Sequence, residues 1–260
     1  MKLKLYQIDA FAKHIFEGNP AAVIPLDIWL EDSLMQSIAA ENNLSETAFF
    51  IATDKGFHIR WFTPICEVDL CGHATLATAY VIFNVLKLAQ TNKITFESRS
   101  GLLNVENNKN RIQLDLPAQP PSACDIPKAL LQAFKIKPVA CYEAEDYLLV
   151  FENEQDIVDA KPDYNLLMKL KHRGIIITAK SIDYDFVSRF FAPKYGIDED
   201  PVTGSAYTQL VPYWATQLGK LEFHSKQVSK RGGELLCILS GDRVYITGKA
   251  VLYLQGEINL

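Results

Sequence analysis

Cys-Gly-His-Ala at 71–74 and Thr-Gly-Ser-Ala at 203–206 are the two stretches that decide the fold. Each is a glycine turn that leads into a run of apolar residues, and the two turns are 132 residues apart. A glycine immediately before an apolar run is typical of a turn that opens a buried helix. The two stretches therefore predict two helices in similar places, each beginning at a glycine turn.

The rest of the chain repeats in the same order. Two further pairs of segments match, at offsets of 129 and 132: Arg60-Trp-Phe-Thr-Pro64 with Arg189-Phe-Phe-Ala-Pro193, and Gly101 to Leu114 with Gly233 to Ile246. Three matches in one order predict two homologous halves, joined near the proline-rich stretch 117–122. We expect an N-terminal half over 1–117, to which the last residues could return, and a C-terminal half over 123–260. The active site is expected in the cleft between them.

Both halves contain a helix without a polar face. The first is expected over 74–83, and its counterpart over 206–215 contains Pro212, which should kink or shorten it. Because such a helix must be surrounded by protein, we predict an α+β protein with two pseudo-symmetric halves, each a central helix wrapped by a curved, mostly antiparallel sheet. Outer helices are expected at about 31–42, 126–134 and 159–170, and strands at 47–52, 57–62, 93–97, 101–106, 111–116, 221–223, 233–240 and 243–253.

The composition limits the class of partner. The 260 residues are 48% hydrophobic and 22% charged, with a net charge of −5 and no long basic stripe. We therefore expect no nucleic-acid partner, while a small anionic substrate is allowed. The sequence contains no apolar run long enough for a membrane span and no signal-peptide pattern. Five irregularly spaced cysteines favour a reducing, cytoplasmic location over a disulfide framework, and their spacing predicts no metal site.

The two turns are candidate substrate-binding elements. A helix N-terminus presents unpaired N–H groups and a partial positive charge, and a glycine lets a ligand approach the backbone closely. We therefore expect Gly72, Ala74, Thr203, Gly204 and Ser205 to hold a carboxylate or an enolate. The alternative is that both glycines serve only as turn residues, but their symmetric repetition favours a binding role.

Four side chains near the turns could carry chemistry. His73 lies beside a helix N-terminus, which should lower its pKa and favour the neutral imidazole, although a single histidine can also be structural. Glu46 stands at the start of an apolar strand, where a raised pKa would suit a general base, or it is an exposed loop acid. Asp200 precedes the second turn and is an acid, a group that orients His73, or a capping residue. Cys71 reads as a small buried thiol, or as a nucleophile paired with His73.

These motifs, taken together, resemble the phenazine-biosynthesis PhzF-like family, which shares the diaminopimelate epimerase fold. The resemblance covers essentially the whole chain. The segments that carry it are Tyr6-Gln-Ile-Asp-Ala-Phe11, Gly18-Asn-Pro-Ala-Ala-Val23, Asn43-Leu-Ser-Glu-Thr47, Phe62-Thr-Pro64, Glu67-Val-Asp-Leu-Cys-Gly-His-Ala-Thr75, Glu199-Asp-Pro-Val-Thr-Gly-Ser-Ala206 and Arg231-Gly-Gly233.

The resemblance implies roles for individual residues. It places the acid/base on Glu46, the Gly-His turn on Gly72 and His73, and the Asp-Pro-x-Thr-Gly-Ser segment on Asp200, Gly204 and Ser205. It also implies proton abstraction from one carbon and return at another, with no metal or organic cofactor, in a homodimer.

Two departures from the fold family bear on the mechanism. The epimerase branch of this fold uses one cysteine in each half, whereas the segment 198–206 contains none, which favours a carboxylate base. Tyr207 stands where many relatives are expected to have a histidine and could alter the pocket wall.

The sequence thus predicts a cytoplasmic, cofactor-independent isomerase that acts on a small carboxylated molecule such as an amino or hydroxy acid. Two alternatives stay open: a non-catalytic small-molecule-binding protein that kept the site, and a thiol hydrolase built on Cys71 and His73.

Overall fold

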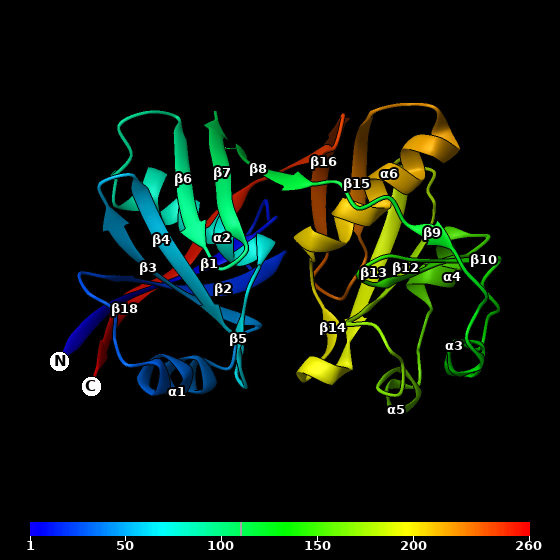
Figure 1. Cartoon of the computed structure of the whole chain (residues 1–260), viewed down its shortest axis with the longest axis horizontal. Helices are drawn as coiled ribbons and strands as arrows, with labels where there is room; N and C mark the ends of the chain where they lie inside the picture. Colours follow the sequence, from blue (N-terminus) through cyan, green and yellow to red (C-terminus); the bar gives the residue numbers. More distant parts are fainter. Residues whose placement is uncertain (110) are drawn as a thin grey trace. The chain divides into compact units, whose positions relative to one another are not determined.

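The computed structural model describes residues 1–109 and 111–260. Its chain divides into an N-terminal unit, made of Met1–Asp115 with Thr247–Leu260, and a C-terminal unit, Leu116–Ile246. The last strand therefore belongs to the N-terminal unit, where the N-terminal ammonium group donates a 2.5 Å hydrogen bond to the carbonyl of Leu260. Figure 1 shows the two chain ends side by side in this unit.

One sheet forms the frame of the N-terminal unit. Its strands follow the order β18-β1-β2-β3-β4-β6-β7-β8, with the short β5 also beside β4. The β2–β3 and β4–β6 pairs are parallel and the other pairs are antiparallel. The elements are β1 Lys2–Ala10, β2 Asn19–Leu26, α1 Asp32–Asn42, β3 Glu46–Thr53, β4 Gly56–Phe62, β5 Glu67–Val68, α2 Gly72–Tyr80, η1 Val81–Val85, β6 Lys93–Ser98, β7 Gly101–Asn108, β8 Arg111–Pro117 and β18 Ala250–Asn259.

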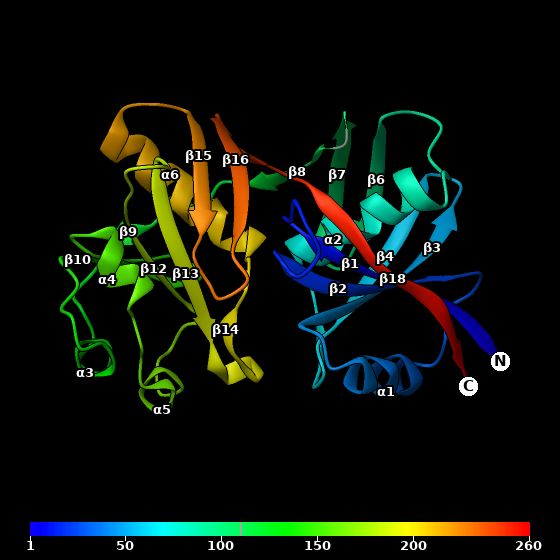
Figure 2. The ribbon, with the colours of Figure 1, turned by 180° about the vertical axis from the view of Figure 1, so that it is seen from behind.

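The C-terminal unit repeats this arrangement, shown from behind in Figure 2. Its strands follow the order β9-β10-β11-β12-β13-β15-β16, with β14 beside β13, and the parallel pairs are β11–β12 and β13–β15. The elements are β9 Ser122–Ala123, α3 Lys128–Ala133, β10 Ala140–Glu143, β11 Tyr147–Val150, α4 Glu154–Val158, α5 Tyr164–Leu167, β12 Ile175–Lys180, β13 Phe186–Ala192, η2 Pro193–Tyr195, β14 Ile197–Asp200, η3 Gly204–Ala206, α6 Tyr207–Leu218, β15 Glu222–Gln227, β16 Gly233–Ser240 and β17 Arg243–Gly248. The sequence repeat is thus also a repeat of strand order and direction.

The helix at the centre of each unit is buried on all sides, as its lack of a polar face predicts. Residues 72–79 of α2 and 207–214 of α6 are all buried. Pro212 does not shorten α6, which continues to Leu218. A proline in a helix leaves the carbonyl four residues earlier without its usual donor. Here that carbonyl, of Thr208, accepts a 2.9 Å hydrogen bond from the N–H of Gln119, so the helix tolerates the proline.

The outer face of each sheet carries its own apolar core. In the N-terminal unit Met35 and Ile38 of α1 pack with Ile24 and Phe49 of the sheet. In the C-terminal unit α3, α4 and α5 supply the apolar cover. Within the described residues, no helix has both the length and the apolar character that a membrane crossing requires.

Two expected elements differ from the structure. The helix expected over 159–170 is reduced to the single turn α5, because Pro162 interrupts the segment and the Asp163 side chain caps α5 by accepting the N–H of Asn165 at 2.9 Å. The strand expected over 243–253 is divided into β17 and β18 at Lys249, whose carbonyl accepts the N–H of Ala12. The chain has passed from the C-terminal to the N-terminal unit just before this point, between Ile246 and Thr247.

Candidate functional site

Strand pairing places Glu46 beside the first turn. Glu46 is the first residue of β3, and it lies opposite Ala21 of the parallel strand β2, which begins at Asn19. The helix α2 begins at Gly72 and packs against both strands. The start of two parallel strands and the N-terminus of a buried helix therefore bring three polar side chains together inside one unit: Asn19, Glu46 and His73.

His73 is held between Glu46 and Asn19. Its Nε2 lies 3.2 Å from Oε2 of Glu46, and the two side chains are only 4% and 13% exposed. Its Nδ1 lies 3.1 Å from Nδ2 of Asn19, whose Oδ1 accepts a hydrogen bond from the Ser45 hydroxyl at 3.3 Å. Because the Asn19 amide nitrogen can only donate, Nδ1 must accept. A neutral His73 therefore carries its proton on Nε2, the nitrogen next to the Glu46 carboxylate, at a 3.2 Å separation that is a contact rather than a hydrogen bond.

Burial determines the charge state of His73. It lowers the pKa of His73 from its ordinary value to about 3, because a buried imidazolium loses its hydration. The lowered direction agrees with the sequence prediction, but burial, rather than the helix dipole, is its leading cause. At neutral pH His73 is thus a neutral imidazole, with a hydrogen-bond donor at Nε2 and an acceptor at Nδ1.

Cys71 also approaches the histidine, from the other side of the ring. Its Sγ lies 3.5 Å from Nδ1 of His73, and the residue is 6% exposed. A thiolate pair would require the histidine to hold the proton that the thiol loses. Since burial lowers the pKa of His73 so far, the neutral thiol and neutral imidazole are favoured. This geometry does not support a nucleophilic Cys71.

The same three side chains could in principle hold a metal ion. One ligand atom each from Glu46, Cys71 and His73 lies within 4.8 Å of the others, and carboxylate, thiolate and imidazole are zinc ligands. However, Glu46 lies at Nε2 of His73 whereas Cys71 lies at Nδ1. An ion would bind one of these nitrogens and replace the contact made there, whereas the observed contacts use both nitrogens at once.

The second turn is fixed by hydrogen bonds around Thr203. The Thr203 hydroxyl donates to Oδ2 of Asp200 at 2.5 Å, and its backbone N–H donates to Oε1 of Gln227 at 2.9 Å. The Gln227 amide nitrogen donates in turn to the backbone carbonyl of Asp200 at 2.7 Å. All three residues are buried. These hydrogen bonds fix the backbone just before the helical segment that runs into α6. The N–H groups of Gly204 and Ser205 lie at the start of that segment.

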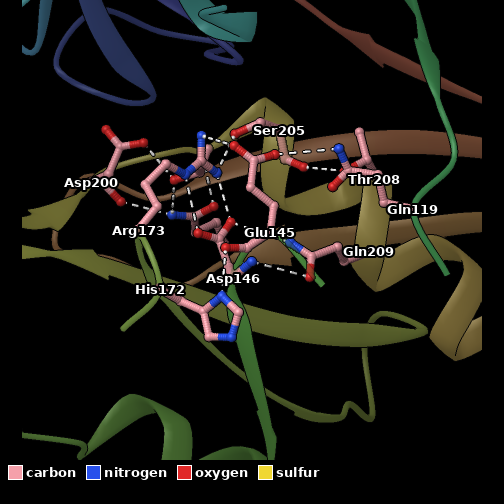
Figure 3. Close-up of polar contacts among 11 residues, drawn as sticks. Gln119, Glu145, Asp146, His172, Arg173, Asp200, Ser205, Thr208 and Gln209 are labelled. Atoms are coloured by element: carbon pink, nitrogen blue, oxygen red, sulfur yellow. Dashed lines mark hydrogen bonds and ion pairs between the residues drawn. The ribbon is translucent and has the colours of Figure 1, made fainter. Parts of the chain in front are cut away.

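Ser205 belongs to a charged network, shown in Figure 3. Arg173 donates from Nη2 to the Ser205 hydroxyl oxygen at 3.1 Å. The same guanidinium donates twice to the fully buried carboxylate of Asp146, at 3.1 and 2.6 Å. Gln209 of α6 also donates to Asp146, at 3.3 Å. The second turn is therefore tied to a buried ion pair within its own unit.

Tyr207 is a core residue of the C-terminal unit. It is 0% exposed, and its ring lies 6.1 Å from that of Phe186. Burial raises the pKa of its hydroxyl. The tyrosine accordingly contributes to packing beneath the turn.

The residues expected at the site thus form two groups. Gly72, His73 and Ala74 lie with Glu46 in the N-terminal unit, and Asp200, Thr203, Gly204 and Ser205 lie together in the C-terminal unit. Sequence reasoning assigned no role to Asn19 or Arg173. Asn19 could have been found, because it stands in the quoted Gly-Asn-Pro motif. Arg173 follows Lys171 and His172 in a polar loop and gave no signal.

Comparison with known proteins identifies the family to which the chain belongs. The model of the family described as "Phenazine biosynthesis-like protein" matches residues 8–256. An uncharacterized isomerase of Pseudomonas aeruginosa is 51% identical, over the full length of both chains. A crystal structure of a phenazine biosynthesis protein of the PhzF family from Enterococcus faecalis superposes with a TM-score of 0.97, at 43% identity, and covers all of both chains.

A more distant structure shares the fold alone. The chain aligns with a hydroxyproline epimerase from Agrobacterium vitis with a TM-score of 0.64 at 9% identity, over 99% of this chain and 92% of that one. The fold is thus the epimerase-like α+β fold that the sequence predicted. The chain belongs to the PhzC-PhzF, or phenazine biosynthesis-like, family, as its motifs indicated.

Proposed function

We propose that the protein is a cofactor-independent isomerase that moves a proton between carbon atoms of a small carboxylated, amino or hydroxy acid-like substrate. Family membership and a relative named as an isomerase support the reaction class. The observation that carries the chemistry is the 3.2 Å approach of Glu46 Oε2 to His73 Nε2 at the head of α2. A carboxylate next to a neutral imidazole can take up a proton and release it again.

In this proposal Glu46 removes a proton from a carbon of the substrate, and the electron pair of the broken C–H bond moves into the conjugated carboxylate system. His73 assists by donating from Nε2 toward Glu46, and the proton then returns to another carbon, so that substrate and product are isomers. The N–H groups at Gly72 to Ala74 stabilise developing negative charge. Asp200 assists as an acid, and its contact with Thr203 fixes the second turn.

The turn at 203–206 holds the substrate's carboxylate in this proposal. Backbone N–H groups and the hydroxyl of Ser205 are donors of the kind that bind anions. Thr203 donates both its N–H and its hydroxyl within the turn, to Gln227 and Asp200, and so serves the site by fixing the turn. That both turns serve one substrate, and that the protein is a homodimer, stay predictions from the sequence. Size-exclusion chromatography with light scattering tests the second of these.

The test is deuterium incorporation from heavy water. The protein is incubated with the common L- and D-amino acids, lactate and malate, and carbon-bound deuterium is measured by mass spectrometry. We expect uptake into at least one acid, and a loss of roughly 100-fold or more in Glu46→Gln. Glu41→Gln, which alters an exposed carboxylate on α1, is the matched control and should exchange like the wild type.

Two results would overturn this assignment. Full exchange by a folded Glu46→Gln protein would remove Glu46 from the reaction. Thermal stabilisation of the wild type by an acid, without any exchange, would favour the alternative of a non-catalytic binding protein.

A further inference from the structure

The two units place different chemistry at equivalent positions. Ser205 corresponds to His73 in the repeat, at the offset of 132. The parallel pair β11–β12 corresponds to β2–β3, with Tyr147 opposite Ile175 in one and Ala21 opposite Glu46 in the other. In the N-terminal unit, Glu46 at the start of this strand pair contacts His73. In the C-terminal unit, Arg173, which lies just before β12 at the equivalent strand start, donates a hydrogen bond to Ser205.

The backbone around Arg173 is shaped for this contact. Asp146 and Arg173 precede the paired starts of β11 and β12, where the Tyr147 N–H donates to the Gly174 carbonyl at 3.1 Å. A Cβ at Gly174 would lie 2.2 Å from the Phe190 ring and 3.0 Å from Oδ1 of Asp146. The guanidinium carbon of Arg173 lies 5.5 Å from the centre of the same ring. Glycine at 174 therefore lets the arginine, the carboxylate and the ring pack together.

The guanidinium controls how Ser205 can bind a ligand. Because Arg173 donates to the Ser205 oxygen, the serine's own O–H must point away from the guanidinium. Asp146 fixes the plane of the guanidinium through two bonds, as Figure 3 shows. Glu145, an exposed side chain, lies 3.2 Å from Nη1. Asp146 balances the charge of Arg173, so the arginine acts by orienting Ser205 rather than by adding net positive charge.

We propose that Arg173 is the positioning residue of the carboxylate-binding turn: it fixes Ser205 as a hydrogen-bond donor to the substrate's carboxylate. The repeat has thus diverged into an acid/base pair, Glu46 with His73, and an anion-orienting pair, Arg173 with Ser205. This inference rests on the proposed function and adds to it the residue that sets substrate affinity.

The test compares Arg173→Lys with Ser205→Ala and the double variant. Lysine keeps the charge that Asp146 needs but cannot make the paired bonds of a guanidinium. For the acid that exchanges best, we expect Arg173→Lys to raise the half-saturating concentration about tenfold, the effect of one bond to a charged ligand, with little change in the limiting rate. In the Ser205→Ala background the same change should have no further effect.

Arg60→Lys is the matched control, because Arg60 of the N-terminal unit also makes paired bonds to a carboxylate, Glu67, at 2.7 Å each. It should leave the half-saturating concentration unchanged. Additive effects of Arg173→Lys and Ser205→Ala, or a fall in the limiting rate alone, would overturn the proposal.

A second readout separates this proposal from the isomerase assignment. If the wild type exchanges none of the acids, the proposed reaction has failed, and thermal melting with the same acids decides the role of Arg173. Stabilisation of the wild type and Arg60→Lys, but much less of Arg173→Lys, would support the positioning role. Equal stabilisation of all three proteins, or none of any, would contradict it.

Discussion

Nε2 of His73 lies 3.2 Å from Oε2 of Glu46 in the interior of the N-terminal unit. This pair couples an ionisable carboxylate to an imidazole that burial keeps neutral. The chemistry therefore depends on where the imidazole proton resides, and the proton's position depends in turn on what contacts the opposite nitrogen. The protonation state of His73, its tautomer and the role of the neighbouring Cys71 thiol can each be tested separately.

The lowered pKa of His73 predicts a loss of stability in acid. Its pKa falls from 6.5 to about 3 on folding, so below about pH 6.5 the unfolded chain binds a proton that the folded protein does not. The contribution of neutral His73 to the free energy of unfolding is therefore complete above about pH 6.5 and is lost progressively as the pH falls toward 3. By pH 5 we expect a loss of about 2 kcal/mol in the free energy of unfolding.

Urea denaturation at about pH 7.5 and pH 5 measures this loss. His73→Gln should lack this part of the pH dependence, whereas other histidines contribute equally to both proteins. An identical pH dependence in wild type and His73→Gln would show that His73 does not hold a lowered pKa.

The contact with Asn19 predicts which nitrogen of His73 carries the proton. Nitrogen NMR of histidine-labelled protein should show a protonated Nε2 and an unprotonated Nδ1 at neutral pH. Asn19→Ala should increase the population of the Nδ1–H tautomer and slow deuterium exchange by at least about tenfold, because the proton then faces away from Glu46. Asn42→Ala, which removes a 3.1 Å bond to Thr47, is the control. An unchanged tautomer in Asn19→Ala would contradict this role.

Cys71 is predicted to be dispensable for the reaction. Cys71→Ala should retain deuterium exchange, because the neutral imidazole beside the thiol does not favour a thiolate. The cost should be limited to packing, about 1 kcal/mol in the free energy of unfolding. Cys237→Ala, which removes a thiol whose pKa burial raises to about 12, provides a matched control for loss of a buried sulfur. Loss of exchange in Cys71→Ala alone would restore the thiol mechanism.

The fold could be predicted because the sequence contains an internal repeat, so that each half encodes the same arrangement of strands and helix. The two apolar helices and their glycine turns follow from hydrophobic pattern alone, and the repeat made the second half a check on the first. The helix expected over 159–170 was too long because a local cap at Asp163, which sets the start of α5, outweighed a weak helical pattern. Such a cap depends on one side chain and leaves no periodic signal.

The candidate site was predictable only where chemistry coincides with a motif. Glu46 and His73 stand in distinctive segments, at a strand start and a helix start. Arg173 stands among other charged loop residues, and only the parallel register of β11 and β12 brings it to Asp146 and Ser205. Some charged side chains are far apart in the chain and are brought together only by strand register. Sequence pattern alone cannot distinguish them from charged side chains that are exposed to solvent.

The close approach at Gly174 gives a last prediction. Gly174→Ala would place a Cβ 2.2 Å from the buried Phe190 ring and 3.0 Å from Asp146, so the ring and the carboxylate must move. We expect a loss of about 1–3 kcal/mol in the free energy of unfolding, together with a raised half-saturating concentration, because Arg173 moves with Asp146. Gly256→Ala, where a Cβ meets nothing within 4 Å, should change neither quantity. Wild-type stability and saturation in Gly174→Ala would show that this packing does not determine the position of Arg173.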